Sequence, residues 1–283
     1  MFILTILSLL VLVFMGVGLY MKSRMILNEH SLWDLLTNAD WKPLSGEFGF
    51  LPFIIGTLAV TALSILIALP ISLLSAIYLS EYAHSWTKRV VFPVLDILAG
   101  IPSVVFGVWG TLIIVPWIAD KLGPHFVEYT SGYTVLASGI VLGVMILPIL
   151  VSLFIEIFTI VPQDYRDAAA SLGATKWQIS TKVILRKSMP GIIAAVVLAI
   201  SKAFGETIAV LMVCGNYAEI PHSLFDPCYP LPALIANNYG EMLSLPLYES
   251  ALMFAAFILF FIILVFNLAS RMMLQHVEKK FKL

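Results

Sequence analysis

The stretch SKAFGETIAV, residues 201–210, places a lysine and a glutamate four residues apart inside a long apolar segment. On one helix, Lys202 and Glu206 would share a face. At the centre of a membrane helix each charge costs about 2.5–3.5 kcal/mol, so the two cost on the order of 5 kcal/mol against lipid. An i,i+4 pair in water returns only about 0.2–0.5 kcal/mol. We therefore expect these residues to meet partners on other helices or to face a water-filled cavity.

Two interpretations of this pair stay open. In the first, an interhelical or intersubunit salt bridge fixes the packing of the helices. In the second, Lys202 offers transient charge compensation to a passing anion, while Glu206 positions the lysine and keeps the site from holding the anion too tightly. The second interpretation requires a site weak enough to release its ion, because a conducted ion must leave its site as well as enter it.

The elements that must position these residues are membrane helices. Hydrophobic residues make up 60% of the 283 residues and charged residues only 12%, which excludes an ordinary soluble domain. A net charge of -1 also argues against nucleic-acid binding. The apolar runs are long and continuous, unlike the alternating strands of a membrane barrel. We predict an all-α, polytopic membrane helical bundle in a single domain, with about six transmembrane helices near residues 2–21, 51–79, 90–118, 134–157, 190–213 and 250–270.

The chain is expected to divide into an N-terminal helix with an outer loop (1–50), a permease core (51–270) and a cytoplasmic loop within that core (158–189). No basic residue precedes the first apolar run and no small-x-small cleavage site follows it, so we interpret it as a retained helix. The segment 22–50 is expected to be a solvated loop whose Trp33 and Trp41 suit the outer membrane interface.

Basic residues set the expected orientation. Eleven of the 16 Lys and Arg residues fall on one side of the predicted helices, which places both termini in the cytoplasm. Lys22 and Arg24 oppose this locally, because they follow the first helix while nothing basic precedes it. The eleven are Lys88, Arg89, Arg166, Lys176, Lys182, Arg186, Lys187, Arg271, Lys279, Lys280 and Lys282.

The third apolar segment contains LAGIPSVVFGVWG, in which Pro102 removes a backbone donor and Gly100 allows close approach of a neighbouring helix. Ordinary packing with a kink is one interpretation, and a bent helix that lines a pathway is the other. Asp96 lies one turn before Gly100, so it either serves such a pathway or extends to the cytoplasmic interface.

The cytoplasmic loop is predicted to fold as a helix, a glycine turn and a second helix. Asp164 is positioned to cap a short helix through YRDAAASL, and Gly173 is positioned to end it in the left-handed conformation. Thr175 and Gln178 have the spacing of a capping box that starts the second helix. The alanines at 168–170 give the first helix a slim body, which favours docking to a cytoplasmic partner over packing against its own bundle.

This loop resembles the signature of permease subunits of bacterial ABC importers: E-A-A, three residues, Gly, nine residues, then I-x-L-P. Asp167, Ala168, Ala169 and Gly173 keep that spacing, but Asp167 replaces Glu and Arg186 stands where Pro is expected. Three further stretches narrow the resemblance to phosphate importers and to the C-type of their two related permease subunits: ADWKP (39–43), AGIPSVVFGVWG (99–110) and FGETIAVLMVCGN (204–216).

The resemblance implies a type I ABC importer permease fold in the bacterial inner membrane. It implies a second homologous permease subunit, two cytoplasmic ATPase subunits on the loops, and a periplasmic phosphate-binding protein that delivers phosphate for import by alternating access. By resemblance, the substrate pathway is assigned to Asp96, Ser103, Lys202, Glu206 and Thr207, and the ATPase coupling to Asp167, Ala168, Ala169, Gly173 and Thr175. The resemblance leads us to expect Arg at position 202, and Lys lacks its bidentate fork.

Other classes of function find less support. The chain has no G-x-x-x-x-G-K-[ST] loop, so we expect a transport subunit that is not itself an enzyme, with no cofactor of its own and with ATP on its partner. The histidines form no metal or catalytic motif. Import of another oxyanion such as molybdate or sulfate stays open, as does a secondary anion transporter, although the inverted repeats of that class are not visible. Cys214 and Cys228 lie in one outer loop, either as a disulfide or as free thiols.

Overall fold

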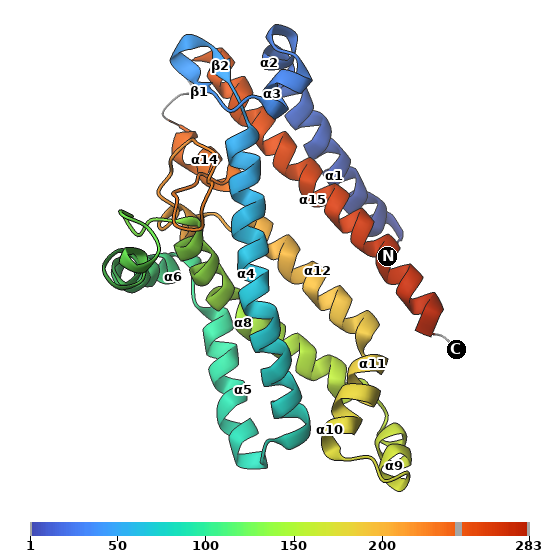
Figure 1. Ribbon diagram of the computed structural model, residues 1–283. Helices are drawn as coiled ribbons and strands as arrows, with labels where there is room; N and C mark the ends of the chain where they lie inside the picture. Colours follow the sequence, from blue (N-terminus) through green and yellow to red (C-terminus); the bar gives the residue numbers. More distant parts are fainter. Residues whose placement is uncertain (1, 241–244, 282–283) are drawn as a thin grey trace.

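The computed structural model describes residues 2–240 and 245–281 (Figure 1). The elements in chain order are α1 (Phe2–Lys22), α2 (Arg24–Glu29), α3 (Leu32–Thr37), β1 (Trp41–Lys42), η1 (Pro43–Ser45), β2 (Glu47–Phe48), α4 (Leu51–Ile77), η2 (Tyr78–Tyr82), α5 (Ser85–Gly100), α6 (Ser103–Trp109), η3 (Gly110–Ile114), α7 (Val115–Trp117), η4 (Ile118–Leu122), η5 (Gly123–His125), α8 (Val135–Ile160), α9 (Gln163–Ser171), α10 (Lys176–Gln178), η6 (Ile179–Ile184), α11 (Leu185–Lys187), α12 (Met189–Gly205), α13 (Ile208–Leu211), α14 (Leu231–Asn238) and α15 (Pro246–Phe281).

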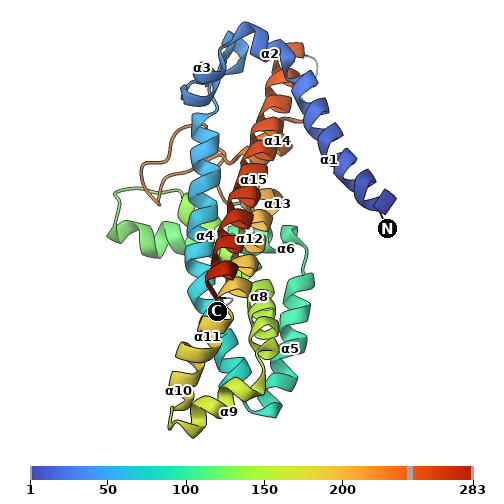
Figure 2. The same ribbon diagram turned by 90° about the vertical axis from the view of Figure 1, so that its right-hand side faces the viewer.

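Helices α4 and α8 form the centre of the bundle and pack against each other (Figures 1 and 2). Their few polar side chains bond back to their own helix: the Thr57 hydroxyl donates to Phe53 O at 2.7 Å and the Ser64 hydroxyl to Thr61 O at 2.8 Å. These bonds satisfy hydroxyl groups that apolar surroundings would otherwise leave unpaired. The predicted helical membrane protein is confirmed by four apolar runs long enough to span a bilayer within the described residues, or five when the bent pair Lys176–Lys187 and Met189–Gly205 counts as one.

The segment predicted to be a solvated outer loop is instead folded into a cap at one end of the bundle. Helices α2 and α3 bury Ile26 and Leu35 completely, and the hairpin of β1 and β2 pairs Trp41 with Phe48. Trp41 packs edge-on against several rings, including Phe53 at a centroid distance of 4.9 Å. Trp33 is 77% exposed, so only one of the two tryptophans helps to build the cap.

Helices α1 and α15 run side by side from the cap (Figure 1). Helix α1 runs toward the cap and α15 runs away from it. The beginning of α1 and the end of α15 therefore both point away from the cap.

The segment 90–118, predicted as one helix that is kinked or bent near Pro102, is divided into separate helices at that point. Helix α5 ends at Gly100, Ile101 and Pro102 are extended, and α6 begins at Ser103. Proline has no backbone N–H and disfavours helical geometry in the residue before it, which explains a break at this position. The run that begins with α6 then crosses the bundle: Figure 1 views it nearly end-on, and Figure 2 shows it extending to the side of α4.

The prediction of one continuous helix over 190–213 is wrong. Helix α12 ends at Gly205, Glu206 is extended with φ -75° and ψ 123°, and the short helix α13 starts at Ile208. Lys202 therefore lies in the last turn of α12 and Glu206 lies just beyond it. The two residues do not share a face of one helix, and the spacing argument for their pairing fails.

Candidate functional site

The cytoplasmic loop folds as the sequence predicts, into an elbow formed by α9, Gly173 and α10. Gly173 has φ +80°, a conformation that residues with a Cβ rarely adopt, and its N–H donates to Ala170 O at 2.9 Å. One detail differs: Asp164 was predicted to cap α9, but Pro162 occupies the N-cap position and Asp164 lies in the first turn. A carboxylate there still interacts favourably with the positive end of the helix dipole.

The second half of the elbow begins with the predicted capping box. The Gln178 N–H donates to the Thr175 hydroxyl at 3.3 Å, and the Thr175 N–H donates to the Gln178 side-chain oxygen at 2.9 Å. Helical structure then continues to Lys187 and bends by 69° into α12. The elbow is therefore joined directly to the segment that carries Lys202.

The outer surface of the elbow is exposed. Helix α9 buries none of its residues, and Ala168 and Ala170 are exposed, as predicted for a slim docking surface. Leu172 at the turn is 88% exposed and Trp177 on the second helix is 56% exposed. A small-residue helix flanked by two exposed apolar side chains, at the end of the bundle away from the cap, is a surface suited to a protein partner (Figure 2).

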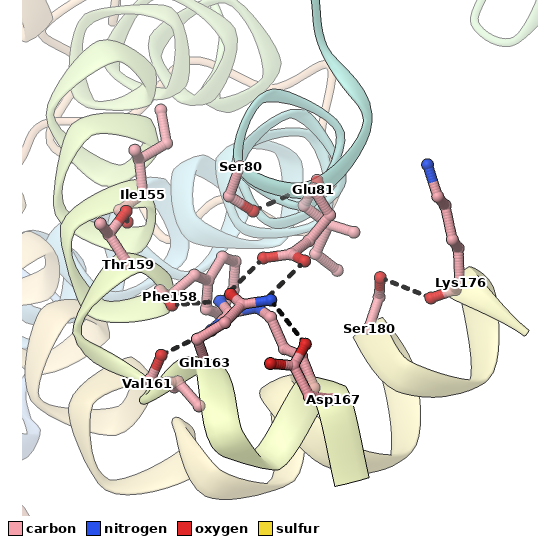
Figure 3. A network of polar contacts seen from close by, with 12 residues as sticks. Ser80, Glu81, Ile155, Phe158, Thr159, Val161, Gln163, Asp167, Lys176 and Ser180 are labelled. Carbon is pink, nitrogen blue, oxygen red and sulfur yellow. Dashed lines mark hydrogen bonds and ion pairs between the residues drawn. The ribbon is translucent and has the colours of Figure 1, made fainter. Parts of the chain in front are cut away.

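The elbow is fastened to the bundle by Arg166, which lies on the inner side of α9. Its guanidinium donates to Glu81 Oε1 at 3.0 Å and to Phe158 O at 2.9 Å, and it also donates to Val161 O. The Arg166 and Glu81 side chains are only 15% and 16% exposed. Figure 3 shows Glu81 from η2 and the carbonyls of Phe158 and Val161 converging on this point. One arginine thus joins α9 to the ends of both α4 and α8.

Sequence reasoning missed this ion pair. Arg166 was counted only as a basic loop residue, and Glu81 was not singled out. The available signal was weak: two opposite charges at the ends of apolar segments on the same predicted side of the membrane. Their separation of 85 residues means that only the tertiary structure brings them together.

Of the five residues assigned by resemblance to the substrate pathway, all but Asp96 lie at or next to one of two helix breaks. Lys202 is exposed on α12, while the neighbouring Ser201 faces α15 and its hydroxyl donates to Asn267 Oδ1 at 3.1 Å. Glu206 and Thr207 are half-buried in the break after α12, and Glu206 borders a small cavity shared with Thr57. In the described part of the chain, no ion pair joins Lys202 to Glu206.

The other break lies between α5 and α6. Ser103 is the first residue of α6 and is half-buried. Helix α6 packs against α13, and the Thr111 hydroxyl donates to Met212 O at 3.1 Å, so the two broken segments lie together. The fit is close, because a Cβ on Gly110 would stand 2.9 Å from Val213 Cγ1. Asp96 lies apart from this junction, exposed on α5, which packs against α8.

Comparison with known sequences gives consistent matches. The family model described as "Binding-protein-dependent transport system inner membrane component" matches residues 68–283. The chain is 35% identical over 262 residues to the "Phosphate transport system permease protein PstC" of Pasteurella multocida, covering 88% of this chain and 81% of the relative. It is 38% identical over 272 residues to the "Probable ABC transporter permease protein YqgH" of Bacillus subtilis, covering 93% and 85%.

Solved structures share the fold. An inward-facing structure of the MetNI methionine ABC transporter matches with a TM-score of 0.61 and 18% identity, covering 84% of this chain and 99% of the other. A bacterial alginate ABC transporter matches with a TM-score of 0.60 and 17% identity, covering 98% and 96%. The predicted type I importer permease fold is confirmed by these likenesses, which at such identity concern the fold alone.

Replacing Arg166 with alanine should loosen the elbow, because it removes the donor to the Glu81 carboxylate and to Val161 O and leaves Phe158 O with only the 3.4 Å bond from the Val161 N–H. We expect a loss of about 3 kcal/mol, measured as a lower melting midpoint of the purified protein in detergent. Gln163→Ala is the matched control, since it removes only an exposed hydrogen bond to Asp167 on the same helix and should leave the midpoint unchanged.

The double variant Glu81→Arg with Arg166→Glu sharpens this prediction. It restores opposite charges but places a carboxylate against the carbonyls of Phe158 and Val161, so it should stay close to the single Arg166→Ala variant. Full recovery of the midpoint would show that charge alone, and not donation to the backbone, holds the elbow.

Proposed function

The chain belongs to the family of binding-protein-dependent transport system inner membrane components, and we propose that it is the phosphate-conducting permease subunit of an ATP-driven importer. The family makes it a multi-pass inner-membrane transport subunit. Phosphate as the substrate is supported by the names of relatives that align with more than four fifths of this chain, from Pasteurella multocida and also from Methanocaldococcus jannaschii at 33% identity.

The observation that carries the proposal is the exposed elbow. A permease without a nucleotide-binding loop needs energy from another chain, and the surface formed by Ala168, Leu172 and Trp177 is where such a chain would dock. Asp167, Gly173 and Thr175 shape that surface by keeping α9 and α10 at a fixed turn. The expected partners are two cytoplasmic ATPase subunits, one on this elbow and one on the elbow of a second permease.

Exposed charges support a second permease subunit. Lys202 and Asp96 are both exposed in the single chain, on helices whose other exposed residues are largely apolar. Lys202 is the fourteenth residue of α12, about 20 Å along a helix that begins at the elbow side. Lipid contact at that depth would be costly, so we place a homologous permease against this face, with the anion pathway between the two subunits.

On this proposal, phosphate passes the two helix breaks, between α5 and α6 and between α12 and α13. A periplasmic binding protein delivers the anion at the cap end, and Lys202 compensates its charge transiently on the way to the cytoplasm. Ser103 and Thr207 supply hydroxyl donors at the ends of broken helices, where irregular backbone is tolerated because it lines a cavity. Glu206, separated from Lys202 by the end of α12, acts by limiting how strongly the anion is held, since a carboxylate repels it.

We infer that both termini lie in the cytoplasm. The elbow carries Arg166, Lys176 and Lys187, the kind of basic loop that stays inside. The beginning of α1 and the end of α15 lie toward the elbow end of the molecule relative to the cap, which supports the same assignment (Figure 2).

The proposed function is tested by reconstituting the chain with its partner permease, the ATPase subunits and a periplasmic phosphate-binding protein in vesicles. We expect accumulation of labelled phosphate that requires ATP, with excess molybdate or sulfate giving little competition. Competition by either of those anions would favour the other oxyanion as the substrate, and uptake driven by an ion gradient without ATP would favour a secondary transporter.

Gly173→Val should weaken attachment of the ATPase, because a β-branched residue cannot adopt φ +80° without strain and the turn between α9 and α10 must shift. We expect co-purification of the ATPase to fall by about tenfold, equivalent to about 1.4 kcal/mol. The control is Gly46→Val, since Gly46 has φ +77° and open space around it but lies in the outer cap. Equal co-purification for both variants would contradict docking at the elbow.

Lys202→Ala should leave assembly intact and reduce phosphate uptake at least tenfold, because the anion loses its compensating charge; Glu206→Ala should also transport poorly. Lys202→Arg should retain uptake. Lys42→Ala, which removes an exposed lysine from the cap, is the control. Wild-type uptake by Lys202→Ala, with normal ATP hydrolysis, would remove Lys202 from the pathway and leave the packing interpretation.

A further inference from the structure

The two cysteines of the chain lie together although 13 residues separate them in sequence. Cys214 follows the end of α13 and Cys228 precedes α14, and both are fully buried thiols. They lie beside α4, since a Cβ on Gly56 would stand 3.5 Å from Cys228 Cβ.

Backbone pairing holds the two residues side by side. The Cys228 N–H donates to Cys214 O at 2.8 Å, and Gly215 forms an isolated parallel bridge with Cys228. The hydrogen bond joins the backbones of the two residues directly, and a disulfide requires that their Cα atoms lie within about 4.4–6.8 Å of each other. The two thiols are also close enough to shift each other's pKa.

We propose that Cys214 and Cys228 form a disulfide on the outer side of the membrane, and that this bond fastens the broken segment after α12 to the outer end of α4. The outer location rests on the orientation given under the proposed function. The compartment outside the inner membrane is oxidising, whereas thiols in the cytoplasm are kept reduced.

The thiols are suited to exchange with an external oxidant. A hydrogen bond from Cys228 lowers the pKa of the Cys214 thiol, while the same hydrogen bond and burial raise the pKa of Cys228. A thiolate is the attacking species in such an exchange, and in the proposed sequence of steps Cys214 attacks first. It attacks the disulfide of a protein dithiol oxidant during folding, before the loop is buried, and expels one thiolate of that oxidant to give a mixed disulfide.

The second step completes the transfer. With Cys214 in the mixed disulfide, its hydrogen bond and its charge, which both raise the pKa of Cys228, are gone. Cys228 then loses its proton, attacks the Cys214 sulfur and expels the second thiolate of the oxidant. Two electrons and the two thiol protons pass to the oxidant, which leaves as a dithiol, while the permease gains one disulfide.

The disulfide would hold in place the outer end of the proposed anion pathway. Cys214 continues from α13, whose start lies next to Glu206 and Thr207. On the other side, Cys228 leads to Leu231, whose N–H donates to the Thr57 hydroxyl of α4 at 2.8 Å. A covalent link between these two points keeps the outer end of the break fixed while the elbow end moves.

The test counts thiols in the full chain, taken from cells in acid to stop exchange, unfolded in SDS and labelled with maleimide-polyethylene glycol. Because the chain has two cysteines, each adduct gives one discrete gel shift. We expect no adduct without reductant and two after reduction. Cys214→Ser and Cys228→Ser are the controls, and each should give one adduct without reductant.

One or two adducts on the unreduced wild-type chain, or a disulfide-linked dimer, would overturn the proposal. The assay reads thiols alone, so loss of phosphate uptake in vesicles would defeat the proposed function and leave this result unaffected. Reduction of the purified protein should also lower its melting midpoint in detergent by about 5 °C, and an unchanged midpoint would overturn the fastening role.

Discussion

The ion pair between Arg166 and Glu81 is the interaction on which the cytoplasmic half of the molecule depends. Without it, α9 would keep its contacts with η6 but lose its hydrogen bonds to the ends of α4 and α8. With it, a nearly buried guanidinium joins the elbow to the end of α4 through a carboxylate and to the end of α8 through two carbonyl oxygens. Such a charge is tolerated at low exposure because its hydrogen-bonding groups are matched. A push on α9 must therefore move α4 and α8 as well.

The opposite half is organised by two interrupted helices. Pro102 separates α5 from α6, and the sequence Gly205–Glu206–Thr207 separates α12 from α13. Because unpaired backbone groups are costly at membrane depth, such breaks persist only where protein or water satisfies them. Here the broken segments satisfy each other in part, since Thr111 of η3 donates to Met212 just after α13. Both breaks thus belong to one packed junction, which connects to the elbow through α12.

The elbow could be predicted because its geometry depends on interactions between neighbouring residues. Features that depend on contacts between distant residues could not be predicted. Gly173 and the Thr175–Gln178 box act within a few residues, so sequence alone gave their geometry, and apolar runs gave the central helices α4, α8 and α15. The end of α12 was missed because hydrophobic periodicity does not distinguish a helix from an extended segment in a short, mostly apolar stretch such as FGETIAV. The cap was missed because Trp41 packs on Phe53 and Tyr248, contacts that no local pattern contains. The pair of Arg166 and Glu81 needed the tertiary fold for the same reason.

The end of α12 changes the meaning of the charge at position 202. On a continuous helix, Glu206 would neutralise Lys202 at short range, and an incoming anion would have to compete with that carboxylate. In the structure, the backbone turns away at Gly205, and Lys202 has no ion-pair partner in the part of the chain that the structure describes. A lysine held this way is not committed to a permanent partner, while the carboxylate beyond the break limits the attraction of the region as a whole. In the proposed anion pathway, the end of α12 at Gly205, and not the four-residue spacing, would let Lys202 attract an anion and then release it.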